Sequence, residues 1–133
     1  MRLVLDASAA VRMVMRAEGA DGLLESVATA TVVAAPSLYV SEVANALWKY
    51  VKASDLDAET ALERLEEAIH LIDAFTPDWE LTTEALTEAA RVEHPVYDLL
   101  YAVLARRTGC AVLTMDERLR RLLGQMGVGI VSV

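Results

Sequence analysis

Short apolar runs alternate along the chain with longer segments in which apolar residues recur every three or four positions. The short runs predict buried strands, because polar or turn-forming residues follow them, and the periodic segments predict helices. The expected strands cover residues 2–5, 31–35, 72–75, 111–114 and 128–133. The expected helices cover residues 8–16, 20–28, 38–52, 57–73, 77–92, 96–108 and 116–125.

Strands that alternate with helices predict an α/β fold, in which a parallel sheet is covered by helices on both faces. The chain has 133 residues, and no linker, repeat or low-complexity stretch divides it. That length is enough for one core, so we expect a single domain over residues 1–133. In such sheets, ligands bind beyond the carboxyl ends of the strands.

Four acidic residues stand where this architecture would deliver side chains to a site. Asp6 and Asp116 each follow a predicted strand, while Glu42 and Asp98 come early in segments that otherwise resemble buried helices. Carboxylates are rarely buried unless they are paired or bound to a cation. If the four converge, Mg²⁺ or Mn²⁺ would offset their repulsion, because hard cations prefer oxygen ligands. The pattern therefore favours a metal-dependent phosphodiesterase.

Each acid also has a simpler structural interpretation. Asp116 alone is typical of a helix cap, and Asp98 of an ordinary acid in a first helical turn. Glu42 shares a helix face with Lys49, so a solvated polar stripe with an ion pair would account for both. Asp6 is harder to explain in this way, because a carboxylate directly after a buried strand needs a partner.

The neighbours of these acids add candidates for a supporting layer and for substrate contact. Ser8 and Thr114 flank the aspartates and could orient them or a metal-bound water, although capping and strand-edge bonding are the simpler roles. Arg12, Arg16 and Arg118 are candidate phosphate contacts, because the guanidinium fork matches a phosphate group. An exposed surface position is the commoner role for any one arginine.

The aromatic residues have two possible roles. Tyr39, Tyr97 and Tyr101 could stack on nucleobases, although packing in or beside the core is the more common role of each. Trp48 and Trp79 are expected in the core.

The charge of the chain is unevenly distributed. The net charge of −8 argues at first against a nucleic-acid partner. Residues 55–93, however, hold twelve acids and two arginines, which leaves a net charge of +2 on the rest of the chain. We predict that this acidic segment faces away from an anionic substrate.

The lengths of the apolar runs and the cysteine content indicate the cellular compartment. The first apolar run stops at Asp6, which is too short for a signal-peptide core, and no later run is long enough to span a bilayer. Cys110 is the only cysteine, so no internal disulfide can form. We expect a cytoplasmic protein with no membrane segment.

Four stretches together resemble the PIN-domain nucleases, most closely the toxins of VapBC-type toxin–antitoxin pairs. They are LVLDAS (3–8), SEVANAL (41–47), YDLLYAVLA (97–105) and VLTMD (112–116). The resemblance implies a three-layer α/β/α sandwich with a central parallel sheet and Mg²⁺- or Mn²⁺-dependent endoribonuclease activity on RNA. It also implies a homodimer and a small antitoxin that wraps the active-site groove.

The resemblance assigns roles by position in this sequence. The matched acids, which would be both the catalytic residues and the metal ligands, are Asp6, Glu42, Asp98 and Asp116. Ser8 and Thr114 match the hydroxyl positions of the family, and Asn45 matches a polar position after the glutamate.

Three other interpretations compete with a nuclease. A PIN-like module without activity could serve as an interaction partner, and absence of metal-dependent RNA cleavage would favour it. A dehalogenase-like phosphatase would require a second acid two residues after Asp6, where Ser8 stands. A nucleotide-binding module would require a Gly-rich loop after the first strand, and none is present.

Overall fold

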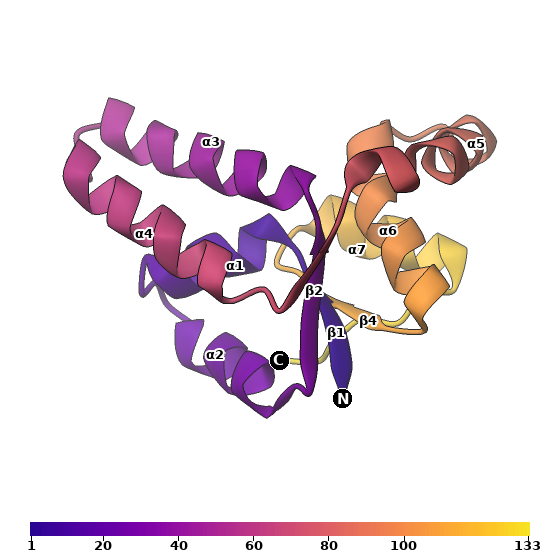
Figure 1. Cartoon of the computed structure of the whole chain (residues 1–133), viewed down its shortest axis with the longest axis horizontal. Coiled ribbons are helices and arrows are strands. Elements are labelled where there is room, and N and C mark those ends of the chain that lie inside the picture. Colours follow the sequence, from indigo (N-terminus) through magenta and orange to yellow (C-terminus); the bar gives the residue numbers. More distant parts are fainter.

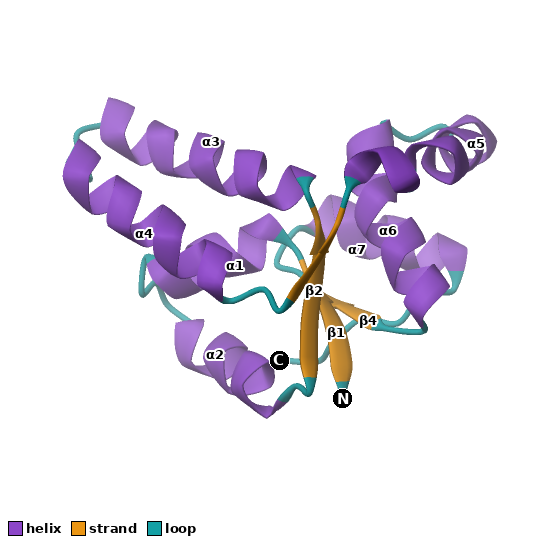
Figure 2. Ribbon diagram, viewed as in Figure 1, coloured by secondary structure: helices purple, strands orange, loops and turns teal.

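The structure, a computed structural model, describes residues 1–133 as an α/β sandwich with three layers (Figure 1). The sheet is parallel throughout and consists of β1 (Arg2–Leu5), β2 (Val32–Pro36), β3 (Ala74–Thr76) and β4 (Ala111–Leu113). The helices are α1 (Ala7–Val14), α2 (Ala20–Thr29), α3 (Leu38–Lys52), α4 (Ala58–His70), α5 (Thr82–Val92), α6 (Val96–Thr108) and α7 (Glu117–Met126), with a 3-10 helix η1 (Asp78–Glu80) before α5. Helices α1 to α4 lie on one side of the sheet and α5 to α7 on the other (Figure 2). The predicted α/β/α sandwich is confirmed.

Strand β1 forms the centre of the core. It lies between β2 and β4, and its Leu3 is paired with Val33 on one side and Ala111 on the other. The side chains of Leu3, Val4 and Leu5 are fully buried. Because helices cover both faces of the sheet, the strand is apolar without alternation, which explains the uninterrupted run in the sequence.

Helix α6 is buried around most of its circumference. Every residue from 99 to 105 is buried, and the helix packs against β1, β2 and β4. Gly109 ends it in the left-handed conformation (φ 66°), which glycine adopts without strain. The buried part begins directly after Asp98, so the first turn of α6 carries that residue to the edge of the core.

The order of the strands creates a switch point beside β1. The sheet order is β3-β2-β1-β4, so the chain first adds strands on one side of β1 and later returns to add β4 on the other. In open α/β sheets, this reversal opens a crevice at the carboxyl ends of the two strands. The backbone N–H of Asp6 donates to the carbonyl of Leu113 at 3.0 Å, so the ends of β1 and β4 are joined at this position.

Two elements predicted in the second half of the chain are shorter in the structure. The strand predicted at residues 128–133 is a single bridge between Val112 and Ile130. The N–H of Val112 donates to the carbonyl of Gly129, and the carbonyl of Val112 accepts from the N–H of Val131, both at 2.9 Å. The helix predicted from residue 77 begins at Thr82, because residues 78–80 form the separate 3-10 turn η1.

The predicted burial of the two tryptophans is also wrong. Trp48 is 54% exposed and Trp79 is 77% exposed. Trp48 lies on the outer face of α3, where the ammonium of Lys52 is 5.3 Å from its ring centroid. Trp79 belongs to η1, a turn of three residues in which no side chain is buried. No helix in the structure combines the length and apolar character that crossing a bilayer requires.

Candidate active site

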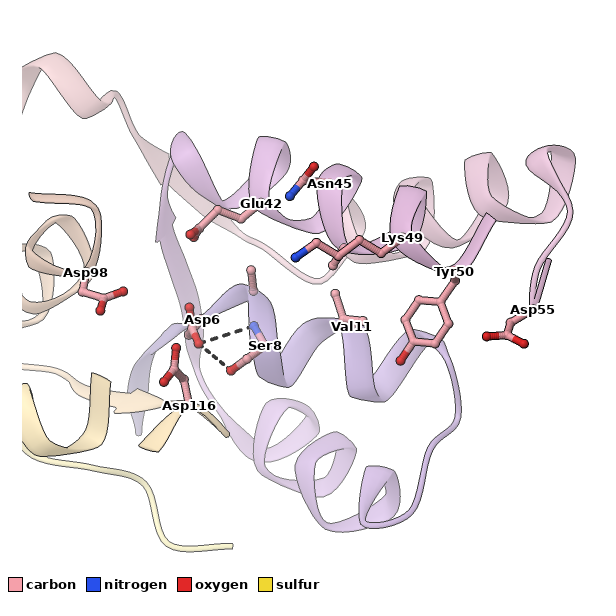
Figure 3. A pocket seen from close by; sticks show the side chains of 12 residues that line it. Asp6, Ser8, Val11, Glu42, Asn45, Lys49, Tyr50, Asp55, Asp98 and Asp116 are labelled. Atoms are coloured by element: carbon pink, nitrogen blue, oxygen red, sulfur yellow. Dashed lines mark hydrogen bonds between the residues drawn. The ribbon is translucent and has the colours of Figure 1, made fainter. Parts of the chain in front are cut away.

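A pocket of about 640 Å³ opens at the carboxyl ends of β1 and β4 and continues between α1 and α3 (Figure 3). Six of the residues predicted from the sequence as catalytic or supporting line it: Asp6, Ser8, Glu42, Asn45, Asp98 and Asp116. The structure therefore brings together four acids that come from four separate regions of the chain.

Asp6 lies at the bottom of the pocket and is only 6% exposed. Its Oδ2 accepts a hydrogen bond of 2.5 Å from the Ser8 hydroxyl and one of 2.7 Å from the Thr114 hydroxyl. Burial raises the pKa of Asp6 above its ordinary value, while these two hydroxyls act in the opposite direction and the charge of Asp116 adds to the increase. The hydroxyls thus stabilise the charged form of an otherwise isolated carboxylate.

The two hydroxyls also connect Asp6 to the chain after β4. The Ser8 hydroxyl accepts from the N–H of Met115 at 3.0 Å, and the Thr114 hydroxyl accepts from the N–H of Asp116 at 3.0 Å. Thr114 is fully buried, so it does not line the pocket itself. The residue that caps α1 is Asp6 and not Ser8, which is a correction to the simpler interpretation of that serine.

Asp116 is a helix cap and a pocket residue at once. Its Oδ1 accepts from the N–H groups of Arg118 and Leu119, at 2.8 and 3.3 Å, at the start of α7. Figure 3 shows its carboxylate beside that of Asp6. Capping fixes one oxygen and orients the other, so the two interpretations of this residue are compatible.

Asp98 has a partner that the sequence analysis did not assign. The Nε2 atom of His94 lies 2.8 Å from Oδ2 of Asp98, and both side chains are largely buried. His94 lies outside α6, one residue before its N-cap Pro95, so the loop that leads into the helix brings its ring to Asp98. No helical spacing in the sequence predicted this contact.

Glu42 is half-buried and is held by the same helix that carries Asp98. The Tyr101 hydroxyl donates to Oε1 of Glu42 at 2.6 Å. Burial is the main cause that raises the pKa of Glu42 to about 7; the Tyr101 hydrogen bond opposes it, and the charges of Asp6, Asp98 and Asp116 add to it. The four carboxylates therefore repel one another across the pocket.

The remaining aromatic and basic candidates are placed differently. Tyr39 and Tyr101 are fully buried, so base stacking by them is excluded, whereas Tyr97 is 65% exposed. None of the three arginines lines the pocket. Arg12 donates to the carbonyl of Glu18 and Arg16 to that of Val14.

Arg118 is exposed on α7. Substrate contact by Arg12, Arg16 and Arg118 stays a prediction.

Lys49 is the only basic residue that lines the pocket. It forms no ion pair, so the pairing of Lys49 with Glu42 that the polar-stripe interpretation required is wrong. Tyr50 and Asp55 complete the far end of the pocket, and the sequence analysis singled out neither. Asp55 is the only acid of the segment 55–93 among the lining residues, so most of that charge lies elsewhere.

The donor set fits a hard divalent cation. Four of the five carboxylates that line the pocket are the acids predicted from the sequence. Their repulsion is offset by no ion pair to lysine or arginine, and oxygen ligands are those that Mg²⁺ and Mn²⁺ prefer. In their present positions, no three acidic, histidine or cysteine side chains are close enough to hold an ion. Mg²⁺ keeps several of its waters and needs few direct carboxylate ligands, which suits an open arrangement.

Comparison with known proteins gives a consistent result. Residues 3–124 match the family model described as PIN domain. The chain is 31% identical over 121 residues to Ribonuclease VapC3 from Pyrobaculum aerophilum, an alignment that covers 90% of this chain and 92% of the relative.

Solved structures share the fold at lower identity. The Mycobacterium tuberculosis toxin VapC20, described as Sarcin-Ricin loop cleaving, aligns with a TM-score of 0.71 and 16% identity over 98% of each chain. DNA-bound VapBC from Salmonella typhimurium aligns with a TM-score of 0.69 and 20% identity over 98% of this chain and 97% of the other.

Proposed function

The chain belongs to the PIN-domain family, and from that premise we propose that it is an endoribonuclease that hydrolyses RNA phosphodiester bonds with Mg²⁺ or Mn²⁺. The observation that carries the proposal is the meeting of Asp6, Glu42, Asp98 and Asp116 in one pocket. The relative called Ribonuclease VapC3 supports RNA as the substrate.

In this proposal the four acids have different roles. Asp6, Asp98 and Asp116 would hold the cation directly or through its waters, and Glu42 would complete the site. A bound cation would supply charge stabilisation for the phosphate and the leaving oxygen, and would make an attacking water available at neutral pH. The protein's part is to hold the carboxylates at fixed positions.

Hydroxyl groups and one histidine ring hold the carboxylates in position. Ser8 and Thr114 fix one oxygen of Asp6, and Tyr101 fixes one oxygen of Glu42. His94 does the same for Asp98. In each case the second oxygen makes no hydrogen bond within the protein, which leaves it available to the pocket.

We further propose that the whole chain acts as one PIN-like domain and as the toxin of a VapBC-type pair. Structures of VapBC from other organisms, such as that from Salmonella typhimurium, support a small antitoxin as partner. A homodimer and a cytoplasmic location belong to the same proposal.

The test is cleavage of a pool of structured and single-stranded RNAs by partner-free protein, with Mg²⁺, with Mn²⁺ and with EDTA. Asp98→Asn should abolish cleavage while the protein stays folded, because the substitution removes a charge and keeps the size of the side chain. Asp21→Asn is the matched control, since Asp21 is an exposed acid in the first turn of α2.

Two results would contradict the proposal. Cleavage that persists in EDTA, or equal cleavage by Asp98→Asn, would exclude this site as a metal-dependent centre. No cleavage of any RNA by folded wild-type protein would favour the inactive interaction module instead.

A further inference from the structure

The pocket extends well beyond the four carboxylates. Its volume of about 640 Å³ lies in the range of about 300–1,000 Å³ that is typical of sites for organic ligands. The additional space follows one face of α3. The residues of this face recur every three or four positions and are Glu42, Asn45, Ala46, Lys49 and Tyr50. A site that served only a hydrated ion would not need this extension.

The far part of the pocket differs chemically from the end that holds the four clustered carboxylates. We call the portion lined by Val11, Ala46, Lys49, Tyr50 and Asp55 the distal arm, in which Asp55 is the only acid. Val11 and Ala46 give it an apolar surface, and the Tyr50 ring, 36% exposed, hangs from α3 beside Val11 (Figure 3). An exposed aromatic ring beside apolar side chains offers a flat surface on which another ring can stack.

Lys49 supplies the only positive charge in this pocket. It extends along the groove toward Glu42 and Asp6 (Figure 3) but forms no ion pair with either. An unpaired ammonium between a carboxylate cluster and an aromatic ring can contact an anion that bridges the two regions. A phosphate group is an anion of this kind, because it carries the charge and is joined to a ring through its sugar.

We propose that the distal arm binds one unpaired nucleotide of the RNA strand next to the cleaved phosphate, with its base on Tyr50 and a phosphate at Lys49. This inference rests on the proposed nuclease function and assigns the contacts of the neighbouring nucleotide to two residues, Tyr50 and Lys49. A base inside a duplex is already stacked and paired, so it cannot reach a ring that lies within a groove.

The first test measures RNA binding without turnover. Fluorescence anisotropy would follow binding of a short single-stranded RNA, taken from the unpaired part of a cleaved substrate, to Asp98→Asn protein in Mg²⁺. In this background Tyr50→Leu should weaken binding by about 5- to 150-fold, the usual effect of losing one stacked base. Tyr50→Phe should bind like its parent, because the ring is kept and only the hydroxyl is lost.

The lysine has a separate signature. Lys49→Gln should reduce the slope of log affinity against log salt concentration by about 0.7, the value for one phosphate contact on a single strand. Lys52→Gln is the matched control, because Lys52 lies three residues further along the same helix, over the ring of Trp48 and outside the pocket. Its salt slope should equal that of the parent.

A second test locates the stacked base. A set of RNAs, each with one abasic position, should include one that binds the parent about 5- to 150-fold more weakly than the intact RNA. The same RNA should show no such loss with Tyr50→Leu, since the stacking partner is already absent there.

The outcomes separate this inference from the function on which it rests. If wild-type protein cleaves RNA while Tyr50→Leu and Lys49→Gln bind as the Lys52→Gln control does, the distal arm is not a nucleotide site and the nuclease proposal stands. If wild-type protein neither cleaves nor binds RNA, the nuclease proposal fails and this inference fails with it.

Discussion

Replacing Glu42 with glutamine should stabilise the metal-free protein at alkaline pH and leave its stability unchanged in acid. Burial, with the charges of Asp6, Asp98 and Asp116, raises the pKa of Glu42 from its ordinary 4.5 to about 7. Glutamine has nearly the same size and its Oε1 can still accept the Tyr101 hydrogen bond. The substitution therefore removes the charge and little else.

The direction of the effect follows from proton binding. An acid with a higher pKa in the folded state binds its proton more tightly there, so stability is lost as pH rises through that pKa. For Glu42 the loss begins near pH 4.5 and is complete above about pH 7. Below this window both variants are uncharged at position 42, and above it only the wild type carries the unfavourable charge.

The magnitude follows from the same two values. The interval from 4.5 to about 7 corresponds to ~3.4 kcal/mol at about 1.36 kcal/mol for each pH unit. Glu42 is only half-buried, so solvent screens its repulsion and we expect a difference of ~1–2 kcal/mol in the free energy of unfolding.

Urea unfolding in EDTA would measure this difference at about pH 4 and about pH 8. Glu25→Gln is the control, because Glu25 is an exposed acid that forms no ion pair. Equal stability of wild type and Glu42→Gln at the higher pH would refute the reasoning, as would an equal gap at both pH values. Added Mg²⁺ should narrow the gap, because an ion that binds the folded state stabilises the charged cluster.

Two further substitutions contrast a buried contact with an exposed one. Thr114→Val keeps the shape of a fully buried side chain but removes the hydrogen bonds to Asp6 and from the N–H of Asp116. The free energy of unfolding, measured with urea, should fall by ~1–3 kcal/mol. An unchanged unfolding midpoint would contradict this. Glu84→Gln removes the negative charge that pairs with Arg106 and Arg107 on the surface between α5 and α6. Its cost should stay below ~1 kcal/mol and disappear in about 1 M salt, so a larger, salt-independent loss would show that this network is structural.

The sequence alone predicted most of the helices and strands, and it singled out four acids that the structure places in one pocket. Residues 3–5 form an uninterrupted apolar run between Arg2 and Asp6, which predicts a short strand covered on both faces. Asp6 followed it, and a carboxylate in that position requires a partner. The strand-end position of Asp116 and the helical positions of Glu42 and Asp98 came from the same local patterns.

Local patterns failed where burial depended on distant neighbours. Trp48 and Trp79 resemble core residues by type, but no part of the core covers the faces on which they lie, and more than half of each residue is exposed. Residues 128–133 resemble a strand, yet only Ile130 forms a bridge to β4, at Val112.

The site shows which features follow from the sequence and which depend on the tertiary structure. The sequence determined that carboxylates would stand at the ends of β1 and β4, since side-chain type and local periodicity are properties of neighbouring residues. Only the tertiary structure decided that Thr114 would hydrogen-bond Asp6, that Tyr101 would hold Glu42, and that Lys49 would stay unpaired in the same pocket. The first contact joins residues 108 positions apart and depends on the pairing of β1 with β4. The second joins residues 59 positions apart and depends on how α3 and α6 approach each other beyond the sheet. No local pattern in the sequence records either arrangement.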